Sequence, residues 1–396
     1  MNRIEKLLLD LCPNGVEFKK LGEVSKFQNG FAFKAKKFKK SGNPIIRITN
    51  IQNNVISTGE MVYFSFSDYK DVNFDNFKIK NNDILIAMSG ATTGKIGIYN
   101  GDDTFYLNQR VGKFIPSSTI LSKFLYHFLL TKVNFIYCLS GGGAQPNLSP
   151  EVLMKQIKIP IPPIEVQKEI AKILDTFTEL EKELEKELEN RKKQYEFYRD
   201  RLLSFDYLES KGGYKLMSLG EVLQYEQPTK YMVSSKEYDD EYSIPVLTAG
   251  QTFILGYTNE TDGVYFASKD NPVIIFDDFT TSIQWVDFPF KIKSSAIKIL
   301  RKTLESIDIR FIFHYMKTII YCPNEHSRQW IAKYSRIQIP VPPIEVQKEI
   351  VKILDIFDSL THSLQDGLPK EIELRKKQYE YYRNKLLSFE ELECRS

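Results

Sequence analysis

Few residues of this chain could carry acid–base, nucleophilic or metal chemistry. The 396 residues include only four histidines and four cysteines. Asp277 and Asp278, followed by Lys291 and Lys293, have the residue types of a nuclease site. No Glu-x-Lys pair follows on a neighbouring predicted strand, however. This cluster therefore gives little support for catalysis.

A glycine-rich segment matches a phosphate-binding loop only in part. Residues 90–96 read GATTGKI, which is one residue short between the glycines and places isoleucine where Mg²⁺ needs a hydroxyl. We predict a turn between two strands there. His127 and His314 stand at equivalent points of two predicted helices, and we predict half-buried structural histidines.

Other catalytic patterns are missing as well. The sequence contains no GxSxG, HExxH or kinase motif, and no Asn/Asp-Pro-Pro-aromatic tetrapeptide of amino-methyltransferases. Cysteines 12, 138, 322 and 394 are too scattered for a zinc site or a disulfide framework, so we expect free thiols. We therefore expect no catalytic residues and no metal ligands.

An internal repeat organises the chain instead. Residues 159–175 (IPIPPIEVQKEIAKILD) recur as 339–355 (IPVPPIEVQKEIVKILD), with 15 identities in 17 positions. Residues 191–205 (RKKQYEFYRDRLLSF) recur as 375–389 (RKKQYEYYRNKLLSF), with 12 identities in 15. The offset changes from 180 to 184, so the second copy carries four extra residues near 365–370.

Each copy is predicted to form one long helix. Apolar residues recur at steps of three, four and seven, which is the pattern of a coiled-coil seam. About 41 residues at 1.5 Å each would make a rod of roughly 60 Å. The insertion in the second copy shifts the seam, and Gly367 and Pro369 predict a kink or a broken turn. The two helices would most simply pair antiparallel.

The segments between the repeats are predicted to be mixed α/β domains, separated by the two long helices with internal pseudo-twofold symmetry. Short apolar runs predict strands, among them residues 83–88 and 111–115 in the first segment and 273–276 and 295–300 in the second. The predicted order is a domain at 1–158, a helix at 159–205, a domain at 206–338 and a helix at 339–396.

Positive charge is concentrated in the first domain. Residues 1–158 carry 21 Lys and Arg against 12 Asp and Glu, or +9, while each of the other three segments carries −2, which gives the total of +3. Five lysines between residues 34 and 40 alternate with Phe33 and Phe38. Such a cluster can neutralise phosphates, although a solvated lysine-rich loop is an equal alternative.

Composition places the chain among ordinary globular proteins. Apolar residues make up 42% and charged residues 27%, which disfavours disorder. No uninterrupted run of 18 apolar residues occurs, and residues 1–12 are too short and too charged for a signal peptide. We expect a cytoplasmic protein without a membrane segment.

Several of these segments together resemble a known family. The duplicated IP(I/V)PPIEVQKEI(A/V)KILD and RKKQYE(F/Y)YR blocks, the LGEV near each domain start, and the SGATTGKIG and SGGGAQPNLSPE segments are similar to the specificity subunit of type I restriction-modification systems. The resemblance covers essentially the whole chain. Its repeat order is specific, whereas the sequences of the variable domains are much less so.

This resemblance implies a non-catalytic role in DNA recognition. Two target-recognition domains would each read one half of a bipartite double-stranded DNA sequence, and the helices would set the spacer. The helices would also dock two methyltransferase subunits, and restriction subunits would join the assembly. S-adenosylmethionine, ATP and Mg²⁺ would be bound by those partners and not by this chain.

The base-reading residues are predicted from hydrogen-bonding side chains on expected loops and from the lysine cluster. The candidates in the first domain are Lys34, Lys36, Lys37, Lys39, Arg47, Thr49, Asn50, Ser89, Thr92, Thr93 and Lys95. Those in the second domain are Thr248, Gln251, Thr280, Thr281, Ser282, Gln284, Ser327, Arg328 and Gln329.

Partner-binding residues are predicted on the repeated helices, at positions that lie off the apolar seam and recur identically. These are Gln167, Lys168, Lys172, Gln347, Lys348 and Lys352. An alternative is a coiled-coil interaction scaffold that binds a protein through its repeated helices without reading DNA.

Overall fold

The computed structural model describes residues 6–7, 10–52, 54–141, 146–249, 253–323, 327–362 and 367–392. By its internal contacts the chain divides into two compact units. Unit 1 comprises Met1–Leu184 and Ile372–Ser396, and unit 2 comprises Glu185–Glu371. Each unit therefore combines one α/β segment with helical parts of both repeats.

Unit 1 contains a six-stranded sheet in the order β2-β11-β8-β9-β5-β4, a four-stranded sheet in the order β6-β3-β10-β7, and the pair β1-β12. Its strands are β1 (Phe18–Lys20), β2 (Ser25–Asn29), β3 (Asn43–Ile46), β4 (Ile51–Gln52), β5 (Val55–Ile56), β6 (Val62–Phe64), β7 (Lys78–Ile79), β8 (Ile84–Ala87), β9 (Ile96–Ile98), β10 (Phe105–Leu107), β11 (Val111–Pro116) and β12 (Lys158–Pro160). Its shorter helices are α2 (Leu21–Val24), α3 (Ser122–Thr131), α4 (Val133–Leu139) and α5 (Pro150–Gln156).

Unit 2 repeats part of this arrangement. Its sheets have the orders β14-β20-β17-β18, β16-β15-β19 and β13-β21. The strands are β13 (Lys215–Ser218), β14 (Leu223–Glu226), β15 (Ile244–Leu247), β16 (Ile254–Thr258), β17 (Val273–Asp277), β18 (Ile283–Val286), β19 (Lys291–Ile292), β20 (Ile297–Lys302) and β21 (Gln338–Val341). The shorter helices are α7 (Phe205–Ser210), α8 (Leu219–Val222) and α9 (Ile309–Met316).

The antiparallel run β2-β11-β8-β9 of unit 1 matches β14-β20-β17-β18 of unit 2 strand for strand. The mixed α/β class is thereby confirmed, as are the strands expected near residues 83–88, 111–115, 273–276 and 295–300. The segment at residues 90–96 is a turn between β8 and β9, as predicted.

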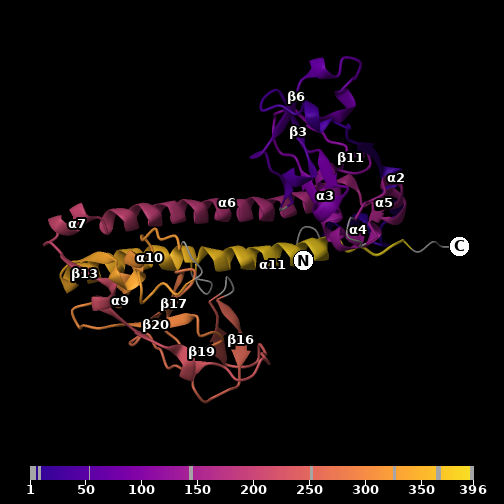
Figure 1. Cartoon of the computed structure of the whole chain (residues 1–396). Coiled ribbons are helices and arrows are strands. Elements are labelled where there is room, and N and C mark those ends of the chain that lie inside the picture. The colour runs from indigo at the N-terminus through magenta and orange to yellow at the C-terminus, as the bar shows by residue number, and fades with distance from the viewer. Residues whose placement is uncertain are drawn as a thin grey trace. The chain divides into compact units, whose positions relative to one another are not determined.

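The first repeat forms one helix, α6 (Ile164–Leu202), as predicted (Figure 1). The second forms two helical segments, α10 (Ile344–His362) and α11 (Leu368–Leu386), which confirms the break predicted near Gly367 and Pro369; residues 363–366 lie outside the described residues. Pro369 stands in the first turn of α11, where no intrahelical N–H is needed. The carbonyl of Gly367 accepts from the N–H groups of Lys370 and Glu371.

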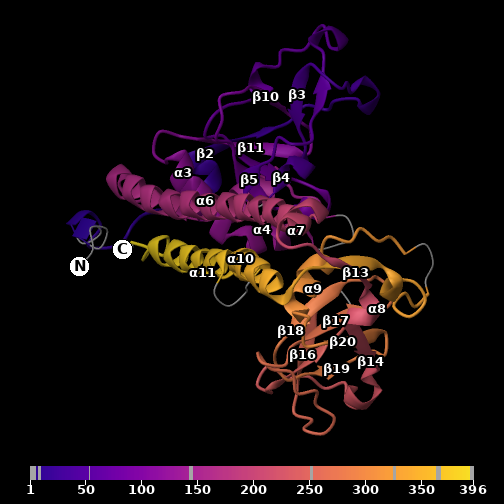
Figure 2. The same ribbon diagram turned by 90° about the vertical axis from the view of Figure 1, so that its left-hand side faces the viewer.

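The core of each unit extends onto the repeated helices. In unit 1, Val166, Ile170 and Leu174 of α6 are buried in the same cluster as α3 and the sheet. In unit 2, Ile350 and Leu354 of α10 do the same against α9 (Figure 2). Apolar burial of this kind is the main stabilising term that holds the α/β segment of each unit on its helices.

Aromatic pairs join segments of the two repeats within each unit. The rings of Phe177 in α6 and Tyr382 in α11 stack with centroids 5.3 Å apart, and Glu181 pairs with Lys376 at 3.3 Å. These two contacts run in opposite chain directions, so α6 and α11 pack antiparallel in unit 1. In unit 2 the equivalent rings, Tyr198 and Phe357, stack at 5.2 Å.

Candidate nucleic-acid interface

An open cleft of about 750 Å³ lies at one end of the six-stranded sheet in unit 1. Three loops form it, and backbone hydrogen bonds hold them together. The N–H of Met88 donates to the carbonyl of Arg110 at 2.9 Å, and the N–H of Leu148 donates to the carbonyl of Met88 at 2.8 Å. The cleft is therefore part of the sheet framework.

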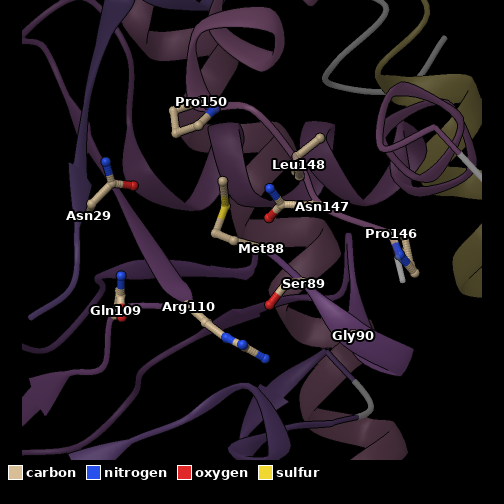
Figure 3. Close-up of a pocket in the computed structure, with 10 residues that line it drawn as sticks. All are labelled: Asn29, Met88, Ser89, Gly90, Gln109, Arg110, Pro146, Asn147, Leu148 and Pro150. Carbon is tan, nitrogen blue, oxygen red and sulfur yellow. The ribbon is translucent and has the colours of Figure 1, made fainter. Parts of the chain in front are cut away.

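The side chains around this cleft are rich in hydrogen-bonding groups. Asn29, Ser89, Gln109, Arg110 and Asn147 all line it. Figure 3 shows Met88 with Asn29 and Gln109 to its left, Ser89 and Asn147 to its right, and Arg110 below it. Amide and guanidinium groups of this kind can pair with base edges in a DNA groove.

Close backbone contacts fix the position of Asn29. It ends β2, where it pairs with Gly112 of β11. The next residue, Gly30, lies so near Asn108 that a Cβ atom would stand 2.0 Å from its carbonyl oxygen. A side chain at position 30 would therefore push the two walls of the cleft apart.

Sequence reasoning found only one residue of the cleft, Ser89. It missed Asn29 at the end of β2, Gln109 and Arg110 in the turn before β11, and Asn147 in the loop between α4 and α5. The sequence does carry a signal for two of them, because polar Gln109 and Arg110 directly precede the apolar start of β11.

Two of the predicted base-reading residues in unit 1 are buried in structural networks, so their assignment to the surface was wrong. The Asn50 side chain accepts from the Arg47 N–H and donates to the carbonyls of Ser57 and Glu60. Thr93 donates to the carbonyls of Gly90 and Pro146. Arg47 and Thr92 are half-buried, while Thr49 and Lys95 are exposed.

The lysine cluster is divided by an acidic neighbour. Lys39 lies 3.0 Å from Asp68, and Lys37 donates to the Asp68 carbonyl and stands 4.4 Å over the ring of Tyr69. Lys34 and Lys36 are exposed and form no ion pair among the described residues. These two lysines remain the better candidates for phosphate contact.

In unit 2 the turn after β17 is organised by Asp277. Its carboxylate accepts from the Phe279 N–H at 2.9 Å and from Thr280 Oγ1 at 2.6 Å. Thr281 adopts a positive φ of 61° in this turn. Ser282 and Gln284 are exposed, and Thr248 is half-buried, whereas Gln251 lies outside the described residues.

Gln329, one of the predicted base-reading residues of the second domain, is buried, so its assignment to the surface was wrong. Its Oε1 accepts from the hydroxyl of Tyr321 at 2.8 Å, and its Nε2 donates to the carbonyl of Ser327 at 2.7 Å. Arg328 is exposed and Ser327 is half-buried. The Gln329 amide therefore shapes the loop that presents Arg328.

Unit 2 has loops equivalent to those that form the cleft of unit 1. The N–H of Asp278 donates to the carbonyl of Ala296 at 2.9 Å, and the N–H of Gln329 donates to the carbonyl of Asp278 at 2.8 Å. These two bonds repeat those of Met88. They place Ala296 at the position of Arg110, and Arg328 at that of Asn147.

The strand position two residues after Arg110 and Ala296 differs between the units. Gly112 of unit 1 has its counterpart in Lys298 of β20, because Gly112 pairs with Ile86 and Lys298 pairs with Phe276. Lys298 is fully buried 3.5 Å from Asp278, and burial lowers its pKa. The nuclease-like cluster suggested by the sequence does not form, since Lys291 pairs with Glu260 at 2.8 Å.

On the helices, two predicted partner-binding residues are buried and the expectation that they lie on the surface was wrong. Gln167 accepts from the Leu121 N–H at 2.9 Å, and its amide donates to Thr119 and Pro162 carbonyls. Gln347 makes the equivalent bonds in unit 2. Both glutamines thus fix the α/β segment of their unit to its helix. The exposed members are Lys168, Lys172, Lys348 and Lys352.

His127 and His314 form structural hydrogen bonds, as predicted, but both are completely buried, so the expectation of half-burial was wrong. His127 of α3 lies 2.9 Å from Asp175 of α6 and 3.0 Å from the hydroxyl of Tyr379 in α11. His314 of α9 lies 2.8 Å from Asp355 and 3.2 Å from Tyr195. The two triads are equivalent, and each tyrosine comes from the repeat that does not supply the aspartate.

The structure offers no metal site in the part of the chain that it describes. Across those ranges, no group of three or more His, Cys, Asp or Glu side chains could hold a metal ion. Cys12, Cys138 and Cys322 are free thiols, as predicted, and Cys394 lies outside the described residues. In the same described part of the chain, no helix is long and apolar enough to cross a membrane.

Comparison with known proteins decides the family. A family model described as the type I restriction modification DNA specificity domain matches residues 13–190 and again residues 211–374. The two matches together cover most of the chain and follow its internal repeat. The chain belongs to this family.

Curated relatives of the specificity-domain family carry the same description. The chain is 51% identical over 189 residues to the EcoR124I/EcoR124II specificity subunit of Escherichia coli, covering 44% of this chain and 45% of that protein. It is 29% identical over 399 residues to a putative type I restriction enzyme specificity subunit, S.HindORF215P, of Haemophilus influenzae, covering 87% and 94%. The alignment thus spans about half the length of the first relative.

A solved structure shares the fold of this specificity-domain chain. The crystal structure of a type I restriction-modification S subunit from M. genitalium matches with a TM-score of 0.65 at 17% identity. The match covers 94% of this chain and 96% of that one. At this level of identity the likeness concerns the fold alone.

Proposed function

We propose that this chain is the DNA-recognition subunit of a type I restriction-modification assembly, and that each unit reads one half of a bipartite double-stranded target. The observation that carries this proposal is the recurrence of the same loop framework in both units. The bonds of Met88 to Arg110 and Leu148 recur as those of Asp278 to Ala296 and Gln329. One framework with different surface side chains suits two readers of different sequences.

The side chains differ where DNA would be contacted. The cleft of unit 1 presents Asn29, Gln109, Arg110 and Asn147, while the equivalent loop of unit 2 presents Arg328. Lys34 and Lys36 would add phosphate contacts to the first reader. The predicted segments 1–158 and 206–338 would then be the two target-recognition domains.

The repeated helices would bind two copies of one methyltransferase subunit, because equivalent surfaces recur on both repeats. Exposed Lys168 and Lys172 recur as Lys348 and Lys352. Large exposed side chains recur as well, with Phe197 at 60% exposure and Tyr381 at 61%. Exposed aromatic groups of this kind are typical of protein interfaces. Restriction subunits would join the assembly.

The chemistry of this assembly would belong to the partner subunits. S-adenosylmethionine would supply the methyl group in the methyltransferase, and ATP and Mg²⁺ would act with the restriction subunits. This chain would contribute sequence choice, and its helices at 159–205 and 339–396 would set the unread spacer between the half-sites.

Reconstitution tests the proposal. The purified chain is mixed with its cognate methyltransferase subunits, S-adenosylmethionine and a randomised duplex library, and the methylated products are sequenced. The assembly should methylate a split sequence, while the chain alone should transfer no methyl group. Methylation by the chain alone, or an assembly without sequence preference, would contradict the proposal, and the second result would favour a protein-binding scaffold.

A further inference from the structure

The equivalent loops of the two units carry their arginines on opposite walls. In unit 1, Arg110 stands in the turn that enters β11, and Asn147 stands on the facing loop. In unit 2 the position of Arg110 is taken by Ala296, and the position of Asn147 is taken by Arg328. This correspondence follows from the matching hydrogen bonds of Met88 and Asp278.

Both arginines are available for a ligand. Arg110 is exposed, lines the cleft and forms no ion pair with any described side chain. Arg328 is exposed beside a loop fixed by buried Gln329, and it too forms no ion pair with the described residues. Its charge stands close enough to buried Lys298 to lower the pKa of that lysine further.

The loops that carry these arginines are rigidly supported. The Arg110 carbonyl accepts from Met88, while Trp330, two residues beyond Arg328, donates to the Asp278 carboxylate at 2.8 Å. A guanidinium presented from such a support can pair with two acceptors at once. In the major groove, guanine offers such a pair in its O6 and N7 atoms.

We infer that Arg110 and Arg328 are specificity-determining residues, and that each reads a guanine in the half-site of its own unit. Because the two arginines stand on different walls of equivalent loops, the two guanines should occupy different positions within their half-sites. The amides of Asn29, Gln109 and Asn147 would read neighbouring base pairs in the first half-site, where adenine is the base that best fits an amide. This inference rests on the proposed function and names residues for it.

The test uses the complete assembly and a randomised duplex library. Arg110→Ala should relax one guanine position in one half-site and leave the other half-site unchanged, and Arg328→Ala should relax one guanine position in the other. Removing a bidentate contact should lower the preference for that base by about 5- to 150-fold. Lys36→Ala is the matched control, which should lower methylation of all sequences evenly.

A second measurement keeps the inference testable if a variant methylates too slowly. Duplexes carry 7-deazaguanine at the guanine in question, which removes only the N7 acceptor, and their binding to the assembly is measured by competition. The 7-deazaguanine should weaken DNA binding by the wild-type assembly. It should cause no further loss of binding by the matching alanine variant. Equal weakening of wild type and variant would show that the arginine does not contact that base.

The outcomes separate this inference from the proposed function. An unchanged methylation motif in both arginine variants would overturn the inference while the function stands. Uniform loss at all sequences would overturn it as well, since that result marks a phosphate contact. A wild-type assembly without any sequence preference would instead contradict the proposed function itself.

Discussion

The Nε2 atom of His127 lies 2.9 Å from Oδ1 of Asp175, and this bond joins helix α3 of unit 1 to helix α6 of the first repeat. A carboxylate only accepts, so Nε2 donates to Asp175, and in the neutral imidazole Nδ1 accepts from the Tyr379 hydroxyl. Burial keeps this imidazole neutral at neutral pH. Its pKa is lowered by burial, which outweighs the bond to Asp175, and Lys123 and Arg383 lower it further.

Stability should therefore depend on pH. A histidine with a folded pKa below its ordinary value of 6.5 binds protons more readily when unfolded. The free energy of unfolding is then unaffected well above pH 6.5 and falls as the pH drops through 6.5 toward the folded pKa. The limiting slope is about 1.4 kcal/mol per pH unit for each such histidine.

Urea unfolding between pH 8 and pH 5 measures this slope. His127→Gln keeps a donor for Asp175 and an acceptor for Tyr379 but cannot be protonated, so it should flatten the dependence. In unit 2, burial lowers the pKa of His314 despite its bond to Asp355, and the charge of Arg310 lowers it further. His314→Gln should therefore flatten the pH dependence in the same way. A slope that persists in the double variant would refute this assignment.

Removing the tyrosine hydroxyls should weaken each unit separately. Tyr379→Phe leaves the Nδ1 atom of buried His127 without its donor, and Tyr195→Phe does the same to His314. Each change should lower the free energy of unfolding by about 1 to 3 kcal/mol. Tyr381→Phe is the control, because that side chain is 61% exposed. Equal stabilities for all three variants would contradict a role for the triads.

Salt dependence should identify the phosphate contacts of the lysine cluster. Replacing Lys34 and Lys36 with alanine should reduce the slope of log K against log salt by about 0.9 for each phosphate that is no longer neutralised. Lys39→Ala should change it less, since that lysine already pairs with Asp68 at 3.0 Å. Titration of the assembly with a duplex at several salt concentrations gives the slopes. The same slope in every variant would place the phosphate-binding residues elsewhere.

Charge reversal on one repeat should remove one partner copy. Glutamate at Lys168 and Lys172 should reduce the bound methyltransferase from two copies to one, and the same change at Lys348 and Lys352 should do so for the other copy. Native mass spectrometry counts the copies. Lys215→Glu, an exposed change on β13, is the control. Two copies retained in both double variants would show that these lysines lie outside the docking surface.

The helices should set the spacing between the half-sites. Removing four residues between 365 and 370 shortens the second repeat by about 6 Å and turns the following segment by about 40°. The unread spacer should change by one or two base pairs while both specified blocks persist. Methylation profiling of the shortened chain measures the spacer length. An unchanged spacer would show that the helices do not set the distance between the half-sites.

Local patterns made the helices predictable, whereas the buried polar residues depended on distant partners. Pro369 and Gly367 predicted the break of the second repeat because helix breaking acts within one turn. Gln167 looked like a surface residue, yet its amide binds Thr119, 48 positions away. Thr93 likewise binds the carbonyl of Pro146 across 53 positions. No periodicity in the sequence reports such pairings.

The polar cleft of unit 1 was missed for a related reason. Ser89 was predicted because it is a polar residue on an expected loop. Asn29 and Arg110, however, reach the same cleft from the end of β2 and from the turn before β11. Which strand ends meet is set by the sheet order, and that order brings β2, β11 and β8 together from distant parts of the chain.

The central claim is that this chain chooses the DNA sequence through two readers, and methylome sequencing tests it most directly. Hosts that carry the cognate methyltransferase with and without this chain are compared. We predict one methylated motif made of two specified blocks separated by unspecified bases, present only when the chain is expressed. A motif that persists without the chain, or one continuous block that replaces the split motif, would contradict the account.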